Sequence, residues 1–216
     1  MKLNSRQLNR TGTRLRLGFT LIEMIGVLAV IAILAAVLVP KVFEAINNAK
    51  VNNAAMSINT AKTAIADHYA KFGSLASSNG IALTPPLTNF DNILVTEGFM
   101  DKPFSVKISA TSGTLTNHVE VIAAVPATQD PTAANAVYNL DNTGAAGVDR
   151  NKALGSAVAQ CVIPGVTEND AKDLNDRLDG TTLGVALGSD DLIGRVKYAT
   201  PGTNATTTVY VYLTHR

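Results

Sequence analysis

Glu23 is the only charged side chain in an apolar run that covers residues 19–39. As a helix, a run of about 20 apolar residues crosses a bilayer, so its length permits a membrane span. A carboxylate at the centre of such a helix costs about 2.5–3.5 kcal/mol on insertion scales, and less near an end, where it reaches the interface. Ionisable groups inside membranes are usually functional and paired. Glu23 therefore needs a partner or a polar surface.

The residues that precede the run are basic. Residues 1–18 contain no acidic side chain and five basic ones, namely Lys2, Arg6, Arg10, Arg14 and Arg16. Removing these five from the 18 basic residues leaves 13 against 17 acidic side chains, so the rest of the chain carries a net charge of −4. This asymmetry favours a cytoplasmic N-terminus with the rest exported, and it argues against nucleic-acid binding by the body of the chain.

Three interpretations of the run compete. A cleaved secretory signal has a shorter apolar core, of about 7–15 residues, and would be cut near Ala35–Ala36. A plain membrane anchor fits the length but leaves Glu23 an incidental charge at the interface. The third interpretation gives Glu23 a partner.

That interpretation comes from the stretch GFTLIEM and the apolar run that follows it up to Pro40. Together they resemble the processing site of type IV prepilins and pseudopilins. The resemblance implies that residues 1–18 are a leader, that a prepilin peptidase cuts between Gly18 and Phe19, and that the new amino group of Phe19 is methylated. It also places Glu23 at the fifth mature position and Pro40 at the twenty-second, where the family carries a near-invariant Glu and often a helix-kinking Pro. Three further residues match the common family sequence: Thr20, Leu21 and Ile22.

In the family, the Glu of one subunit neutralises the terminal amine of a neighbour during filament assembly. The resemblance assigns this assembly role to Phe19 and Glu23. Residues four apart share a helix face, and a helix N-terminus favours a nearby carboxylate. An unpaired charge inside an apolar bundle is costly, so the pair would set the axial register. One departure is Ala32, which stands where many members have Gly.

Helical periodicity continues beyond Pro40, which we expect to bend or locally melt the helix. We expect the helix to end at Gly73. Before it, apolar residues recur at spacings of three and four, namely Val51, Ala55, Ile58, Ala61, Ile65, Tyr69 and Phe72. A helix over residues 19–72 would be about 80 Å long, too long for a small compact domain. We therefore divide the chain into a leader (1–18), a transmembrane or filament-core helix (19–40), an amphipathic helix (41–73) and a globular head (74–216).

The head has the pattern of an α+β domain in which an antiparallel sheet packs on the amphipathic helix. We expect short helices at 91–98 and at 167–180, the second beginning at an N-capping Thr167. Strands are expected at 105–110, 119–125, 136–140, 158–163, 195–199 and 207–213. This arrangement is similar to the head of pilins. Many pilins close a C-terminal loop with a disulfide, which the single Cys161 cannot form.

Residues suited to catalysis or to metal binding are scattered. We expect Cys161 to be a buried, unreactive thiol, His68 to be structural and His215 to fray at the chain end. Asp141–Asn151 and Ser189–Asp191 are expected to be solvated turns, not ion sites, and the acids of TENDAKDLNDRLDG a solvated helix face. No enzyme motif is present, and we expect no enzyme activity, cofactor or metal.

The sequence thus predicts a filament subunit that starts in the bacterial inner membrane and ends in an external pilus or a periplasmic pseudopilus. Its partners would be further copies of itself, the prepilin peptidase and methyltransferase, the assembly platform and minor pilins. The 18-residue leader favours the pilin class with long leaders, whereas Phe as the first mature residue is commoner in the other pilin class. A secretion pseudopilin is the alternative. A monomeric membrane-anchored binding protein is a third possibility. Adhesion, motility, DNA uptake and secretion are all compatible with this N-terminus.

Overall fold

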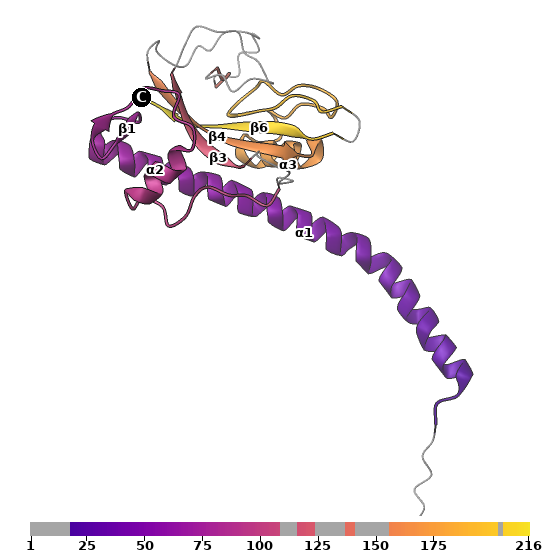
Figure 1. Cartoon of the computed structure of the whole chain (residues 1–216). Coiled ribbons are helices and arrows are strands. Elements are labelled where there is room, and N and C mark those ends of the chain that lie inside the picture. The colour runs from indigo at the N-terminus through magenta and orange to yellow at the C-terminus, as the bar shows by residue number, and fades with distance from the viewer. Residues whose placement is uncertain (1–17, 109–115, 124–136, 141–155, 203–204) are drawn as a thin grey trace, which may run out of the picture. The chain divides into compact units, whose positions relative to one another are not determined.

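The computed structural model describes residues 18–108, 116–123, 137–140, 156–202 and 205–216. The chain divides into two units, residues 1–44 and residues 45–216. Helix α1 (Leu21–Phe72) contributes to both (Figure 1). The second unit also contains β1 (Ser77–Ser78), β2 (Ile81–Ala82), α2 (Phe90–Thr96), β3 (His118–Ala123), β4 (Ala157–Val166), α3 (Glu168–Leu178), β5 (Val196–Lys197) and β6 (Thr207–His215).

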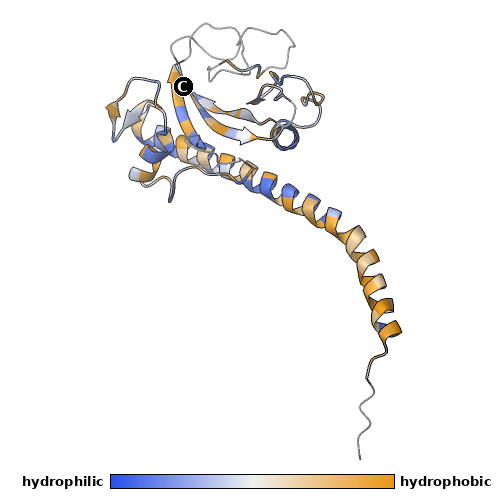
Figure 2. Cartoon of the chain, turned by 45° about the vertical axis from the view of Figure 1, so that its right-hand side comes forward, coloured by the Kyte–Doolittle hydropathy of each residue, from blue (hydrophilic) through white to orange (hydrophobic). Residues whose placement is uncertain are grey.

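In the first unit, every described residue is exposed, from Gly18 to Glu44. Figure 2 shows apolar colouring over the amino-terminal part of α1. By length and composition this helix could cross a membrane, and none of its most apolar stretch is buried. The chain stays helical through Pro40, so the expected local melting is absent. The expected kink stays a prediction.

In the second unit, α1 buries one stripe of side chains and leaves the rest in solvent. The buried residues are Val51, Ala54, Ile58, Ala61, Ala64, Ile65 and His68. The predicted stripe was close to this, but Ala55, Tyr69 and Phe72 are only half-buried. The helix ends as expected at Gly73, which has φ +72° and whose N–H donates to the Tyr69 carbonyl at 2.7 Å.

The sheet is antiparallel, with strand order β3-β4-β6-β5, and the α+β prediction is confirmed. In the middle of the sheet Cys161 of β4 lies opposite Val119 of β3 and Val211 of β6. Residues that lie directly opposite each other on neighbouring strands point to the same face of a sheet, so these three share one face. They belong to the same buried cluster as Ile58 of α1 and Leu174 of α3. Both helices therefore cover this face of the sheet.

Two expected strands are wrong or incomplete. No strand forms in the described part of 105–110. Val106 and Ile108 are buried as a strand would require, but the Val106 carbonyl accepts a hydrogen bond from the Asn117 side chain and not from a neighbouring strand. Of the expected strand 136–140, residues 137–140 are described, and Asn139 makes only a single bridge to Ile193.

Other boundaries also moved. β4 is longer than predicted, and the hairpin of β1 and β2 was not predicted. That hairpin turns at Asn79 and Gly80, which have φ of 47° and 80° as a tight two-residue turn requires. β6 continues to His215, which lies opposite Val158, so the expectation that His215 frays is wrong.

Candidate functional site

The candidate site at the start of α1 is organised by Thr20 and Glu23. The backbone N–H and the hydroxyl of Thr20 both donate to Glu23 Oε2 at 2.8 Å, and the Glu23 N–H lies 3.3 Å from the Thr20 hydroxyl oxygen. This reciprocal arrangement is a capping box, which satisfies N–H groups that the first helical turn leaves unpaired. Within this chain Glu23 therefore has a local role as a helix cap.

Gly18 and Phe19 precede the first helical residue and lie in the open. Phe19 is 81% exposed, and a side chain added at Gly18 would meet nothing within 4 Å. Because α1 begins at Leu21, the helix face expected to hold Phe19 and Glu23 together starts only after Phe19. No contact in the described chain explains why position 18 should be glycine.

His68 is the most enclosed titratable group of α1. Its Nδ1 lies 2.6 Å from Glu97 Oε2 and its Nε2 lies 3.2 Å from the Ser77 hydroxyl. The rings of Phe72, Phe90 and Phe99 surround it at centroid distances of 4.9, 5.2 and 5.8 Å. Glu97 also accepts from the Asn79 N–H, so the group ties the β1–β2 hairpin to α1. The structural role expected for His68 agrees with this enclosure.

Cys161 is fully buried in β4, and burial raises the pKa of its thiol well above the ordinary value. The reactive form of a cysteine is the thiolate, so this thiol is unreactive in the folded chain. The structure agrees with the expectation for Cys161.

The other face of the sheet carries a buried polar row. The Tyr138 hydroxyl donates to Gln160 Oε1 at 2.5 Å, and Gln160 Nε2 donates to Glu120 Oε1 at 2.7 Å. His118 ends the row, with its Nε2 3.9 Å from Glu120 Oε2. The Glu120 carboxylate raises the pKa of His118, against the opposing effect of partial burial.

The side chain of Asp179 is buried and joins the end of α3 to β5. Its carboxylate accepts from Arg195 Nε at 2.8 Å, from the Arg195 N–H at 2.6 Å and from the Val196 N–H at 2.9 Å. The Asp179 side chain is 3% exposed. The expected solvated face is therefore wrong at this position, because the carboxylate turns inward to close the helix against the sheet.

Asp191 is also buried, which corrects the expectation of a solvated Ser189–Asp191 turn. Its carboxylate accepts from Asn175 Nδ2 at 2.7 Å and from the Ile193 N–H at 3.1 Å. Its neighbour Asp190 is exposed, as expected. The other expected turn, Asp141–Asn151, lies outside the described residues.

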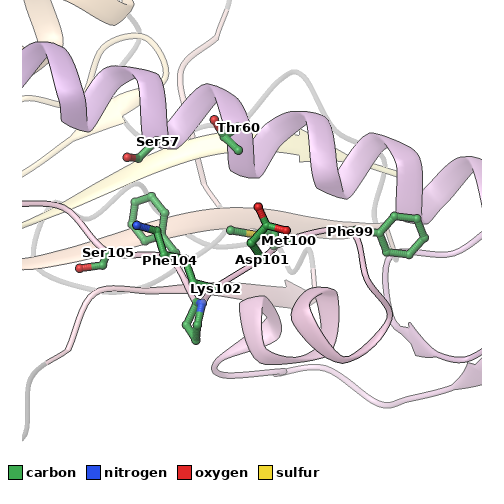
Figure 3. Close-up of a pocket in the computed structure, with 9 residues that line it drawn as sticks. Ser57, Thr60, Phe99, Met100, Asp101, Lys102, Phe104 and Ser105 are labelled. Carbon is green, nitrogen blue, oxygen red and sulfur yellow. The ribbon is translucent and has the colours of Figure 1, made fainter.

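A hollow of about 260 Å³ lies between α1 and the segment that follows α2. Ser57 and Thr60 project from α1 toward this segment, which supplies Asp101, Lys102 and Phe104 (Figure 3). The Thr60 hydroxyl donates to the Met56 carbonyl of its own helix. The lining contains no nucleophile held by a base. No group of three or more His, Cys, Asp or Glu side chains suited to a metal occurs among the described residues.

Comparison with known proteins supports the amino-terminal site. Residues 13–39 match the model of the prokaryotic N-terminal methylation motif. No curated protein sequence and no solved structure matches the chain. The chain therefore carries the signature of type IV prepilins at its N-terminus, followed by a long apolar helix and an α+β region. The match ends at Val39, before the head begins.

Two features of the site were absent from our sequence prediction. The capping box is visible in the sequence, because Thr20 and Glu23 stand at the required spacing before an apolar run. The inward turn of Asp179 and Asp191 had no local signal, because their partners Arg195 and Asn175 lie 16 residues away.

Proposed function

We propose that this protein is a subunit of a type IV pilus-like filament. In this proposal, a prepilin peptidase removes residues 1–18, Phe19 is methylated, and the mature chain polymerises through α1. The observation that carries the proposal is the apolar first part of α1, which is exposed in all its residues up to Lys50 and lies within or directly after a motif of the methylation type. Such a surface is stable only in lipid or against other apolar helices. A head-to-tail polymer of identical chains would supply the second of these surroundings.

The capping box adds a physical detail to the role of Glu23. In the single chain its carboxylate satisfies the Thr20 N–H and hydroxyl. In a filament the same carboxylate would also face a cationic terminal amine of a neighbouring copy. Capping needs only a hydrogen-bond acceptor, whereas charge neutralisation needs the negative charge. The two roles are therefore separable by substitution.

The test compares Glu23→Gln, Glu23→Ala and the control Glu44→Ala by counting filaments and by assaying leader removal. Glu44 is an exposed acid of the same helix, paired with Lys41 at 3.1 Å. We expect all three variants to lose the leader. Both Glu23 variants should assemble poorly, although glutamine retains an acceptor for the cap, and Glu44→Ala should assemble normally. Normal filaments from Glu23→Gln would show that charge pairing is not required.

The location of the processed chain separates the alternatives. In our proposal it starts in the inner membrane, with its N-terminus in the cytoplasm, and ends in material that can be sheared from cells. A processed chain confined to the membrane fraction would indicate a pseudopilus or a minor component. A chain that is never processed would indicate a monomeric membrane-anchored protein.

A further inference from the structure

The part of α1 that packs on the head is held by polar contacts near both of its ends. Near the end of α1, His68 Nδ1 lies 2.6 Å from Glu97 Oε2. At the other end, Arg177 of α3 donates from Nη1 to Asn52 Oδ1 and from Nη2 to Asn48 Oδ1, the second at 2.9 Å. Within the described ranges, no other hydrogen bond or ion pair joins α1 to α3. Arg177 is therefore the polar link between these two helices.

This link lies at the point where α1 becomes buried. Every described residue from Gly18 to Lys50 is exposed, and Val51 is the first buried one. Asn48 and Asn52 are four residues apart, so their side chains lie one helical turn apart on the same face. The two contacts therefore hold α1 on both sides of Val51.

Burial of apolar area is weak at this end of the packed helix. Between Val51 and Ile58 the only buried side chain of α1 is that of Ala54. Hydrophobic stabilisation grows with the apolar area buried, and an alanine contributes little of it. A guanidinium, by contrast, is a rigid fork of donors that can serve two acceptors at once. The geometry of Arg177 thus supplies here what the apolar stripe lacks.

We propose that Arg177 is a latch that holds residues 48–54 of α1 against α3, and that it is thereby a positioning residue for filament assembly. The second part rests on the function proposed above. Copies in a head-to-tail polymer make the same contacts only if each presents the same surface. Lifting of residues 48–54 would expose Val51 and Ala54 and would move the point at which the head releases α1. The latch makes that point the same in every copy.

Thiol labelling of an Ala54→Cys chain in detergent micelles tests the latch. Ala54 is 1% exposed, so a cysteine there reacts only when this part of α1 lifts, and the natural Cys161 is buried and unreactive. We expect Arg177→Ala to raise the labelling rate at least about fivefold, through the loss of two hydrogen bonds from a charged donor. The control cysteine is Ala64→Cys, which is 3% exposed and lies one turn from His68, and its rate should not change.

Further variants separate the fork from the charge. Arg177→Lys keeps a cation in the last turn of α3, where the helix dipole favours it, but cannot bind both amides, so the rate should rise by less than in Arg177→Ala. Replacing both Asn48 and Asn52 by alanine should match Arg177→Ala, although alanine favours the helix, and combining the three should add nothing. The matched control is Lys172→Ala, a cation of α3 that pairs with Asp176 of its own helix. Its labelling rate should be that of the parent chain.

An unchanged rate in Arg177→Ala would overturn the latch, as would an equal increase at the control cysteine, which only general unfolding would produce. Filament counts in chains without the added cysteine test the positioning role. Arg177→Ala should lose its leader but give fewer filaments than Lys172→Ala, and equal counts would overturn that role. Absence of filaments from the wild-type chain would overturn the proposed function and the positioning role together, whereas the labelling rates would still decide the latch.

Discussion

Helices α1 and α3 are both capped by a threonine that has an acidic residue three positions further on, but their surroundings are opposite. At α3, Thr167 accepts from the Asp170 N–H, and the following turns bury Ala171 and Leu174 in the core. At α1, Thr20 and Glu23 form an equivalent cap, but every residue that follows up to Lys50 is exposed. The two helices therefore start in the same way and differ in what covers them.

The difference separates helix formation from helix burial. α3 is mostly polar, and contacts within its own chain hold it in place. The first part of α1 is apolar on all sides, and the described chain supplies nothing to cover it. An apolar helix of this kind is typical of a membrane span or of a core built from several chains. Substitutions in α3 should therefore change the stability of the head, whereas substitutions in the first part of α1 should leave it unchanged.

The largest expected effect on head stability comes from the core under α3. Leu174→Ala removes a fully buried side chain and should lower the free energy of unfolding by about 2–5 kcal/mol, through lost burial and the cavity left behind. Val37→Ala, at a position of α1 that is 70% exposed, should leave head unfolding unchanged. Denaturant unfolding followed by tyrosine fluorescence checks both. A similar loss for the two variants would contradict the proposed separation.

The next effect tests whether α3 is held by its end as well as by its core. Asp179→Ala removes the carboxylate that accepts hydrogen bonds from Arg195 and Val196. In denaturant unfolding it should lower the free energy of unfolding by about 2–3 kcal/mol. The estimate is below that for a fully buried ion pair, because the Arg195 side chain is 37% exposed. Asp173→Ala on the same helix is the control, and its exposed side chain should change stability by no more than about 0.5 kcal/mol. An equal loss of stability in Asp179→Ala and Asp173→Ala would show that Asp179 has no special role.

A smaller effect compares the two caps directly. Thr167→Ala should lower head stability by about 1 kcal/mol, the usual cost of losing an N-cap. Thr20→Ala should leave head unfolding unchanged and increase amide exchange only in the first turn of α1. If Thr20→Ala lowered the unfolding midpoint of the head as much as Thr167→Ala, the independence of the two regions would be disproved.

The smallest effect depends on pH and concerns the buried polar row on the sheet face that lies opposite to the helices. Glu120 raises the pKa of His118, so protonated His118 contributes stability below its ordinary pKa, near 6.5. That stability is lost as the pH rises through the raised value. It should be under about 1 kcal/mol, because the His118 side chain is 22% exposed and the two charged groups are 3.9 Å apart. The measurement compares the pH dependence of the free energy of unfolding in His118→Gln with that in the wild-type chain. Parallel stability curves between pH 6 and 8 would show that the pair contributes nothing.

Prediction from the sequence worked where one segment carries its own pattern. The prepilin signature was recognised from one continuous stretch, GFTLIEM and the apolar run behind it, and α3 and β6 have clear helix and strand periodicity. The turn residues Asn79 and Gly80 were equally local, so the β1–β2 hairpin could also have been predicted.

Prediction failed where distant segments meet. The enclosure of His68 depends on Glu97, 29 residues away, and on rings that come from α2 and the residues after it. The burial of Asp191 depends on Asn175 and on the bridge to Tyr198. An aspartate in a Ser-Asp-Asp turn is usually solvated, and only the tertiary fold shows that this one is not.

Mass spectrometry of material sheared from cells is the most direct test of the proposed function. We predict a peptide that begins at Phe19, carries a methyl group on its terminal amine and is enriched in the sheared fraction. A variant with a bulky residue in place of Gly18 should retain the leader and be absent from that fraction. An intact leader in the wild-type chain, or a cut near Ala36, would contradict the account and leave Glu23 as the cap of an ordinary targeting segment.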